Sequence, residues 1–511
     1  IDGKLCTAPA GTTILECARM NGISIPTLCY LKGLNEIGAC RMCLVEVKGA
    51  RGFVAACVYP IEPPRKDRVT GEEVMMEVRT NTPALRKARK TTLELILSAH
   101  DKKCLTCVRS GNCELQKLSN DYGLDEIRFE GSNLKFEKEV SSAHMVRDNN
   151  KCILCRRCVA ACKKNQEVAV ISPAGRGFNT RITCAFDRAL ADVPCVSCGQ
   201  CIVVCPTGAL YEKDQTEQVW AALNDPTKHV VVGTASSVRA TLGECFGDPI
   251  GTNVQGKMVT ALRNLGFDGV FDVDTAADVT IMEEGTEFIH RLQEGGPFPL
   301  ITSCSPGWVK FCEYYYPEFT QNLSSAKSPQ GMFGALMKSY YAEKKGIDPK
   351  DIVVVTIMPC TAKKFEAGRE ELSRDGMPDV DISITTRELA RMITTSGQVW
   401  AELEESDFDP IFGVGTGAGH LFGASGGVME AALRTVVEKL ENRELEKLEF
   451  EAVRGVAGIK EATYTVAGQE VRVAVVSGLS NARKLLEMIK SGEKFYHFIE
   501  IMACPGGCVN G

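Results

Sequence analysis

Cysteine is the residue type that dominates the chemistry of this sequence. The 511 residues include 24 Cys, and most stand in the first 205 positions with C-x2-C or C-x2-C-x2-C spacing. In a long chain with no basic-then-apolar leader at Ile1, such clusters favour metal ligation over a disulfide framework. Zinc usually needs only one or two four-ligand sites, so this many thiols favour iron-sulfur clusters, which carry electrons.

The first ligand set has the pattern C-x10-C-x2-C-x13-C and consists of Cys29, Cys40, Cys43 and Cys57. A short helix is expected over 14–25 and a strand over 43–47, with small residues such as Gly38 allowing a tightly folded loop. The pattern resembles adrenodoxin-like and plant-type ferredoxins and predicts one 2Fe-2S cluster. A zinc ribbon is the alternative.

The second set has the pattern H-x3-C-x2-C-x5-C and follows an amphipathic stretch at 83–99. Its residues are His100, Cys104, Cys107 and Cys113. One imidazole beside three thiols is also typical of a structural zinc site. Because the pattern lies between two other cluster modules, a 4Fe-4S cluster is the preferred interpretation, with a potential shifted by the absent fourth thiolate.

The third region repeats C-x2-C-x2-C-x3-C twice, which is typical of two-cluster bacterial ferredoxins. In that pattern the fourth cysteine of each run ligates the cluster of the other run. The predicted ligands of these two 4Fe-4S clusters are Cys152, Cys155, Cys158, Cys162, Cys195, Cys198, Cys201 and Cys205. Together the three regions form a chain of clusters, which must end at a reactive site.

Beyond residue 228 the cysteines become sparse, and short apolar runs alternate with helical stretches. This alternation predicts α/β layers with buried, largely parallel strands, whose carboxyl ends gather ligands. A helix is expected over 428–439, after a glycine-rich loop at 413–419. The expected strands are 230–233, 269–271, 300–302, 352–358, 381–384, 471–476 and 497–502.

Three of these strands end at cysteine, namely at Cys304, at Cys360 and at the pair Cys504 and Cys508. A lone buried cysteine usually packs as a small apolar residue. Several at equivalent strand ends favour a metal site built from distant segments. Glu284 and Glu287 are spaced one helical turn apart, and a solvated helix face is the alternative interpretation of these two.

Segments 302–308, 358–366 and 500–508 resemble the active-site motifs of the iron-iron (FeFe) hydrogenases of anaerobic bacteria. The stretch 417–430 also follows the family pattern. The resemblance covers essentially all 511 residues and is to the larger form of these enzymes, which has an accessory cluster-bearing N-terminus.

The resemblance implies an H-cluster, which is a 4Fe-4S cubane joined through one cysteine to a two-iron unit bearing CO, cyanide and a bridging azadithiolate. Carried over by motif, Cys360, Cys504 and Cys508 ligate the cubane, and Cys508 is the bridge. Lys363 holds a cyanide by a charge-assisted hydrogen bond. The other residues implied to contact the cofactor are Ser305, Met358, Met502, Phe422 and Ser237.

A proton path is also implied by the resemblance. Cys304 passes protons to and from the bridging amine, and the path continues to solvent through Glu284, Ser324, Glu287 and Arg291. Such a division is physically coherent, because proton reduction needs electrons from a chain of clusters and protons from a separate relay of titratable groups.

Ser305 is the main departure from the family pattern, which has the fourth cubane cysteine at this position. Serine can ligate iron as an alkoxide, but its hydroxyl is far less acidic than a thiol, and the exchange makes a cluster more labile. Alternatively, Cys304 moves in as ligand at the expense of the proton path. Ser236 is a second departure, because the family commonly has proline before the serine at position 237.

The predicted fold is an α+β set of N-terminal iron-sulfur modules followed by an α/β H-cluster domain of the iron hydrogenase type. The family continues beyond Gly511, so we expect the C-terminal end of that domain to be missing. The expected boundaries are 1–80 for the 2Fe-2S ferredoxin-like module, 81–140 for the 4Fe-4S module with one histidine and three cysteine ligands, 141–220 for the two-cluster module and 221–511 for the H-cluster domain.

The implied function is the reversible reduction of protons to H2, with reduced ferredoxin or flavodoxin as electron donor. One alternative, suggested by Ser305, is an impaired electron-transfer subunit of a larger NAD(P)-linked or formate-linked complex. Another is the cluster-bearing subunit of a respiratory NADH dehydrogenase or a molybdenum formate dehydrogenase.

Maturation proteins and NAD(P)-binding flavoprotein subunits are expected partners. The net charge of −6 argues against nucleic acid, and no apolar run is long enough to span a membrane, so a cytoplasmic protein is expected.

Overall fold

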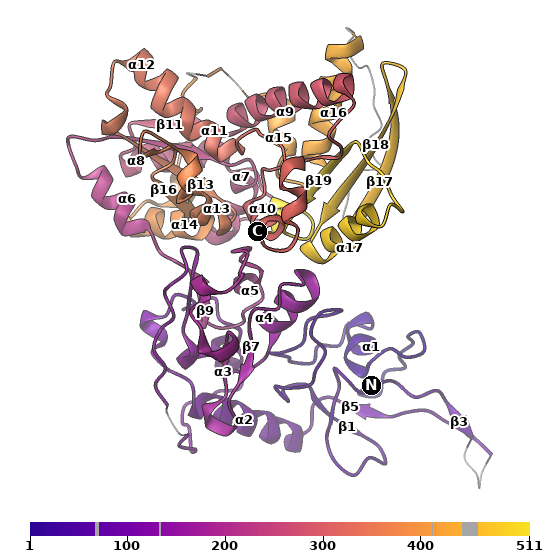
Figure 1. Ribbon diagram of the computed structural model, residues 1–511. Coiled ribbons are helices and arrows are strands. Elements are labelled where there is room, and N and C mark those ends of the chain that lie inside the picture. Colours follow the sequence, from indigo (N-terminus) through magenta and orange to yellow (C-terminus); the bar gives the residue numbers. More distant parts are fainter. Residues whose placement is uncertain (67–70, 132–133, 411, 414, 442–457) are drawn as a thin grey trace.

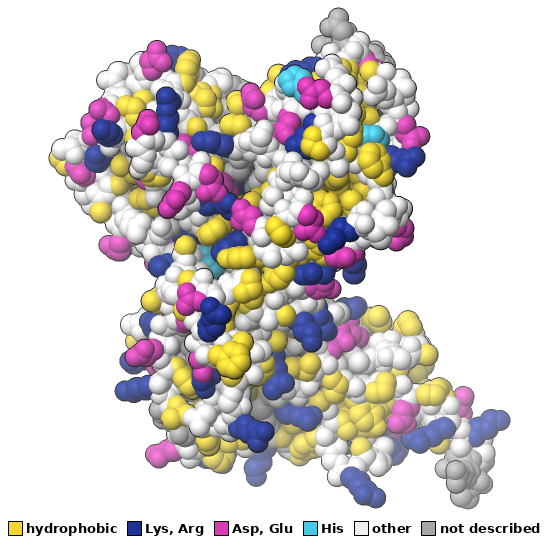
Figure 2. Space-filling view, in the orientation of Figure 1, with side chains coloured by type: hydrophobic (Ala, Val, Ile, Leu, Met, Phe, Trp, Pro, Cys, Tyr) yellow, Lys and Arg dark blue, Asp and Glu magenta, His cyan; other side chains and the backbone are white. Residues whose placement is uncertain are grey.

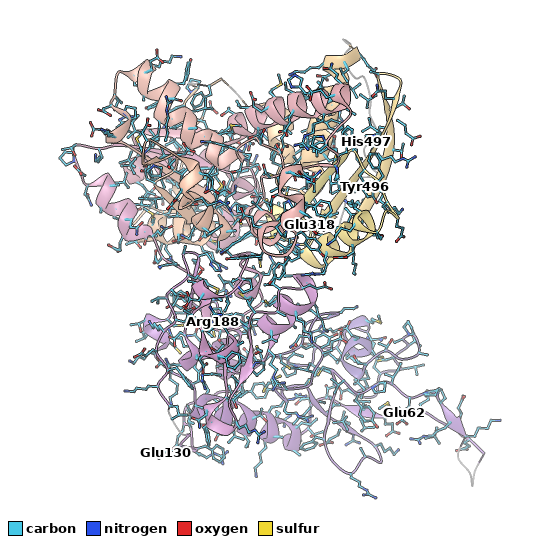
Figure 3. The ribbon with its side chains drawn as sticks, in the orientation of Figure 1. Glu62, Glu130, Arg188, Glu318, Tyr496 and His497 are labelled. Atoms are coloured by element: carbon cyan, nitrogen blue, oxygen red, sulfur yellow. The ribbon has the colours of Figure 1, made fainter. Side chains whose placement is uncertain are left out.

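The computed structural model describes residues 1–66, 71–131, 134–410, 412–413, 415–441 and 458–511. Position 414 of the expected glycine-rich loop lies outside the described residues. Figure 1 shows two lobes: residues up to about 215 form the lower lobe and the rest forms the upper one. In Figure 3 the lower lobe carries the labelled residues Glu62, Glu130 and Arg188, and the upper lobe carries Glu318, Tyr496 and His497.

The lower lobe consists of short helices and strands joined by long loops. Its helices are α1 (Ile14–Met20), α2 (Pro83–Ser98), α3 (Glu114–Asp121), α4 (Arg157–Ala160) and α5 (Gln200–Val203). A small sheet has the order β2-β1-β5, with strands Val54–Ala55, Leu44–Val47 and Val78–Arg79. The remaining strand pairs are β3–β4 (Arg65–Lys66, Glu73–Val74), β6–β9 (Met145–Arg147, Leu210–Glu212) and β7–β8 (Ser172–Ala174, Arg181–Thr183).

Helix α1 ends at Met20, earlier than the expected boundary at residue 25. The Asn21 amide caps the helix, and Gly22 has a φ of 75°, which stops the helical path. Ile25 still packs into the apolar core of this module, which also contains Leu15 and Val45. The loop after the helix contributes apolar residues to the same core. For this reason the apolar pattern in the sequence continues beyond the end of the helix.

The upper lobe contains two four-stranded sheets (Figure 1). The first is entirely parallel and has the order β11-β10-β13-β16, with strands Gly269–Asp272, His229–Thr234, Ile352–Met358 and Ile382–Thr385. The second has the order β12-β19-β18-β17, with strands Leu300–Ile301, Phe498–Met502, Gln469–Ser477 and Ile459–Val466. The expected α/β layers and all the expected strands are thereby confirmed.

Strand β17 was not expected from the sequence. It runs antiparallel to β18 at the edge of the second sheet. Exposed positions alternate with covered ones along β17, so this strand lacks the continuous apolar run that identified its parallel neighbours.

Helices cover both sheets of the upper lobe. Phe288 of α9 (Asp274–Glu294) stacks on Phe498 of β19 with ring centroids 5.0 Å apart, and this pair joins that long helix to the second sheet. Among the described residues, no helix combines the length and apolar composition needed to cross a bilayer. The helices are α6 (Thr216–Leu223), α7 (Val238–Thr241), α8 (Gln255–Leu265), α9 (Asp274–Glu294), α10 (Pro306–Tyr315), α11 (Pro329–Leu336), α12 (Ala342–Lys345), α13 (Ala362–Ala367), α14 (Thr386–Thr395), α15 (Gly417–Leu421), α16 (Gly427–Glu441) and α17 (Leu479–Lys490), and a β14–β15 hairpin (Ser373–Arg374, Met377–Pro378) lies between α13 and β16.

The two lobes approach closely at Gly199, which precedes α5. Gly199 has a φ of +72°, and a Cβ at this position would lie 2.4 Å from the Thr361 hydroxyl oxygen of the upper lobe. Only glycine fits both the left-handed backbone and this contact.

Gly199→Ala is therefore expected to lower the free energy of unfolding by about 2 to 5 kcal/mol, because a left-handed backbone cost of about 1 to 2 kcal/mol adds to an overpacking cost of about 1 to 3 kcal/mol. Gly251→Ala is the matched control, because Gly251 has a φ of +78° but nothing within 4 Å of the added Cβ. Denaturant unfolding followed by circular dichroism compares the two. Equal losses would contradict a tight contact at Thr361.

Candidate metal centres and the cavity between the sheets

A cavity lies where the carboxyl ends of the two sheets of the upper lobe meet. Its walls include residues that follow or end β10, β11, β12, β13 and β19. The structure thus brings together the strand ends that were expected to converge. The site residues that line the cavity are Ser237, Cys304, Met358, Cys360, Lys363, Phe422, Met502 and Cys508.

Cys360, Cys504 and Cys508 form a group of thiols beside this cavity. Burial is the main cause that raises the pKa of both Cys504 and Cys508, and the neighbouring Cys360 thiol is the second cause. The pKa of Cys508 is raised to about 12. All 24 cysteines are among the described residues, and none forms a disulfide. Thiols held this close together without a disulfide fit the donor set of an iron-sulfur cluster, which takes them as thiolates.

Ser305 lies beside this group, at the start of α10. Its hydroxyl oxygen accepts a hydrogen bond from the amide of Ala503, the neighbour of Cys504, at 3.2 Å. Ser305 therefore stands where a fourth ligand would be expected. Its hydroxyl, however, stays protonated at neutral pH, whereas a thiol that binds a metal loses its proton. Three thiols and one hydroxyl thus lie together at this point.

Lys363 is the cationic group of the cavity. The residue is only 8% exposed, and its Nζ lies 2.7 Å from a Glu366 carboxylate oxygen, 2.8 Å from the Ser328 hydroxyl and 3.2 Å from the Cys304 carbonyl oxygen. These contacts fix the ammonium group at the wall of the cavity. These three acceptors use all three N–H donors of the ammonium group, so an anionic ligand at the cavity wall would take the place of one of them.

Ser237 lines the same cavity, and its hydroxyl group is available for a hydrogen bond. Its hydroxyl oxygen is buried and has no partner among the described residues. An orphaned buried hydroxyl costs free energy unless a bound group satisfies it. Ser236, the second departure from the family pattern, also lines the cavity, as do the apolar side chains of Met358, Met502 and Phe422.

The expected proton-path residues lie near one another between the cavity and the surface, although neither carboxylate oxygen of Glu284 has a hydrogen-bond partner among the described residues. Cys304 lines the cavity, and the neighbouring Glu284 carboxylate adds to burial in raising the pKa of the Cys304 thiol. Glu284 is fully buried; burial raises its pKa to about 7, and the Ser324 hydroxyl lowers it less strongly. Ser324 lies 3.4 Å from a Glu287 carboxylate oxygen, and Arg291 donates to the other at 2.6 Å. The partly exposed Glu287 completes a path towards solvent.

The cavity also has polar residues that the sequence analysis missed. Gln330 lines it and donates its amide to the Lys363 carbonyl oxygen at 3.2 Å. Asp274, also in the wall, lies 3.0 Å from Arg239, and burial together with Asp272 raises its pKa to about 7. Both residues belong to helices without a recognisable motif, so no spacing in the sequence marked them.

In the lower lobe, the two ferredoxin-like cysteine runs surround two separate cavities. The fourth cysteine of each run lies with the first three of the other run, which is the crossed arrangement that the sequence predicted. One cavity is lined by Cys162, Cys195, Cys198 and Cys201, and the other by Cys152, Cys155, Cys158 and Cys205. Each group fits the four thiolates of a 4Fe-4S cluster.

The cysteines of the other two ligand sets also lie near one another. A hydrogen bond to Cys43, burial, and the nearby thiols of Cys29 and Cys40 raise the pKa of Cys57, so all four thiols of the first set are neighbours. In the second set, Cys104 and Cys107 add to burial in raising the pKa of Cys113. His100 has a buried Nδ1 without a partner among the described residues, and burial lowers its pKa to about 4. A neutral imidazole is the form that binds metal.

Polar side chains connect the modules at their ligand cysteines. The Asn35 amide donates to the carbonyl oxygens of Cys29 (2.7 Å) and Cys155 (3.0 Å). Arg109 donates to the Cys205 carbonyl oxygen at 2.9 Å, and the Gln200 amide donates to the Cys504 Sγ at 3.2 Å. No pattern in the sequence predicted these three side chains, because each contact joins segments far apart in the chain.

Comparison with known protein families matches nearly the whole chain. The family described as iron only hydrogenase large subunit, C-terminal domain, matches residues 228–511. In the lower lobe, a 2Fe-2S iron-sulfur cluster binding domain matches residues 1–66, the NADH-ubiquinone oxidoreductase-G iron-sulfur binding region matches 89–128, and a 4Fe-4S dicluster domain matches 151–209.

Individual proteins are similar over the full length. The chain is 48% identical to the NADP-reducing hydrogenase subunit HndD of Solidesulfovibrio fructosivorans and 46% identical to iron hydrogenase 1 of Clostridium pasteurianum, each match covering 100% of this chain and 87% of the relative. Among solved structures, an apo form of the [FeFe]-hydrogenase HydA1 of Chlamydomonas reinhardtii is 43% identical with a TM-score of 0.53, covering 58% of this chain and 83% of that one.

Proposed function

Because the chain belongs to the iron-only hydrogenase family, we propose that it catalyses the reversible reduction of protons to H2, with reduced ferredoxin or flavodoxin as electron donor. The observation that supports this most directly is the cavity between the two sheets. Cys360 and Cys508 meet Lys363 and Cys304 at its wall, so soft metal ligands, a cationic donor and the first group of a proton relay face one space.

In this proposal Cys360, Cys504 and Cys508 would hold the iron-sulfur part of an H-cluster, and Ser305 would take the fourth ligand position. When bound, the H-cluster supplies the iron at which two protons and two electrons combine to H2. Lys363 orients a cyanide ligand through a charge-assisted hydrogen bond, and the unpaired Ser237 hydroxyl offers a second donor. The apolar side chains of Met358, Met502 and Phe422 exclude water from the cavity.

Protons reach the cavity through side chains of the chain itself. Cys304 exchanges a proton at its Sγ with the cavity and with the Glu284 carboxyl group behind it. Glu284 suits this task because a relay group works best when its pKa is close to the working pH, and burial raises its pKa to about 7. Ser324 and Glu287 continue the relay, while Arg291 positions Glu287.

Electrons reach the cavity from the lower lobe, which we propose holds one 2Fe-2S cluster and three 4Fe-4S clusters. The polar bridges suggest the route. Asn35 and Arg109 connect the two N-terminal modules to Cys155 and Cys205, which belong to one cluster site. The neighbouring site with Cys198 and Cys201 then leads to the cubane. Figure 2 shows many Lys and Arg side chains on the visible face of the lower lobe, which suits an acidic electron carrier.

The second candidate function is electron transfer within a larger complex, by a hydrogenase-like subunit with an impaired H-cluster. Ser305 favours it, because its hydroxyl already accepts the Ala503 amide hydrogen bond and is a weaker ligand than a thiolate. The similarity to a subunit of an NADP-reducing hydrogenase makes NAD(P)-binding flavoprotein subunits the expected partners in that case. Maturation proteins remain expected partners of the first function.

Infrared spectroscopy after anaerobic maturation with the two-iron unit tests the proposal. We expect stretching bands of iron-bound CO and cyanide, because the cavity retains Lys363, Ser237 and three cubane cysteines. Ser305→Cys is the control. Bands in this variant but not in the unmodified chain would support the electron-transfer candidate, and bands in neither would contradict the assignment of the cavity to an H-cluster.

A further inference from the structure

The junction between the two-cluster module and the H-cluster domain contains two buried glutamines that act differently. Gln166 is fully buried; its amide donates to the Ala503 carbonyl oxygen at 3.0 Å and accepts from the Leu479 amide at 3.4 Å. Gln200 is 5% exposed and donates to the Cys504 Sγ at 3.2 Å. Gln166 thus joins backbone to backbone, whereas Gln200 reaches a thiol of the proposed cubane.

Gln200 occupies an unusual place in the sequence. It stands between Cys198 and Cys201, two cysteines that line the same cavity of the lower lobe as Cys162 and Cys195. Its side chain nevertheless points across the junction to Cys504, which lies with Cys360 and Cys508. The backbone of Gln200 is therefore part of the cluster site in the lower lobe, whereas its side chain contacts a cysteine of the proposed cubane site.

A hydrogen bond to a cysteine ligand has a definite electrostatic effect. When a cluster takes up an electron, negative charge increases on its sulfur ligands, and an N–H donor stabilises that charge. Hydrogen bonds to the sulfurs are among the factors that set the reduction potentials of iron-sulfur clusters. The low polarity of a buried junction strengthens the effect.

We propose that Gln200 is a positioning residue that holds the Cys504 thiolate and raises the reduction potential of the cubane, so that the cubane accepts electrons from the cluster held by Cys162, Cys195, Cys198 and Cys201. In this step one electron leaves the accessory cluster, which is oxidised, and enters the cubane, which is reduced; no bond forms or breaks and no proton moves. The inference rests on the proposed function and goes beyond it.

The test measures the cubane apart from catalysis. The full chain is loaded anaerobically with iron and sulfide but not with the two-iron unit, and an EPR-monitored titration gives the midpoint potential. Subtracting the spectrum of Cys360→Ala, which removes one cubane ligand, isolates the cubane signal. Gln200→Leu removes the donor at similar volume and is expected to make reduction of the cubane about tenfold less favourable, which is a shift of about 59 mV to more negative potential.

Two further variants separate this effect from loss of packing. Gln200→Glu keeps the size but replaces the donor with a carboxylate, and it is expected to shift the potential in the same direction and further. Gln166→Leu is the matched control in the same junction; it is expected to lower thermal stability and leave the cubane potential unchanged. An unchanged potential in Gln200→Leu and Gln200→Glu, or an equal shift in Gln166→Leu, would overturn the inference. A chain without any cubane signal would instead overturn the proposed function, and the inference with it.

Discussion

Glu284→Gln is expected to reduce the rate of H2 evolution by about 10²- to 10⁴-fold, which is the usual contribution of a positioned acid or base. Glutamine has nearly the same shape as glutamate but cannot give up or take up a proton in the working pH range. Glu284 is fully buried between Cys304 and Ser324, so water has no direct access to replace it. Hydrogen production by the matured protein with a chemical reductant measures the effect.

Glu283→Gln is the control, since Glu283 is the exposed neighbour on the same helix. It is expected to retain the full rate. Iron-bound CO and cyanide bands of equal intensity in both variants would show that the cofactor is present in each. A full rate in Glu284→Gln with these bands present would exclude Glu284 from the proton path.

The rate of H2 evolution is also expected to depend on pH through Glu284. Burial raises the pKa of this carboxyl group to about 7. Below that pH the group is protonated and can donate towards Cys304; above it the group is ionised, and the rate of H2 evolution falls as pH rises. A pH profile of the unmodified protein should bend near pH 7, and Glu284→Gln should lack that bend. The same bend in the variant would assign it to another group.

Ser305→Cys is expected to increase the amount of cubane and to raise H2 evolution by roughly tenfold or more, since changes even in the outer shell of a metal site alter affinity or activity by about 10- to 100-fold. A cysteine at this position offers a thiolate to iron, whereas the serine hydroxyl stays protonated and accepts a hydrogen bond from Ala503. Iron content, EPR spectra and hydrogen production measure the effect.

Ser303→Cys provides the comparison for this gain. Ser303 lies two residues earlier in the same loop, and its hydroxyl donates to the Ala326 carbonyl oxygen at 2.9 Å instead of facing Ala503. A cysteine at position 303 is expected to change neither the iron content nor the EPR spectrum. If Ser305→Cys likewise changed neither, Ser305 would be a competent ligand or the cubane would have recruited another donor.

The parallel strands of the upper lobe were predictable because each is a short apolar run buried on both faces. β13, for example, is covered along nearly its whole length. β17 was not predictable, because its solvent-exposed positions interrupt the apolar run. The end of α1 was placed too late because Ile25 belongs to the same core as the helix. Burial pattern was therefore readable from the sequence, whereas the backbone path through a shared core was not.

The cysteine groups of the candidate site were predictable from spacing and from their place at strand ends. The crossed sharing of Cys162 and Cys205 between the two runs followed from the repeated pattern. Gln200 was not predictable: any residue fits between two ligands of a C-x2-C pair, and only the folded structure shows that its side chain reaches Cys504. That Gln330 and Asp274 line the cavity was not predictable for the same reason.

The pairing of β12 with β19 has a consequence for biosynthesis. Leu300 pairs with Phe498, so this sheet has a high contact order and closes only when β19 has left the ribosome. The predicted ligand cysteines of the lower lobe all lie at or before Cys205, and the cavities that two of these sets line extend no further along the chain than Leu210. Accessory clusters can therefore load on a nascent chain, whereas Cys504 and Cys508 emerge much later than the cysteines of the lower lobe. Insertion of the catalytic cofactor is accordingly expected to be post-translational, into a protein whose electron-carrying modules are already complete.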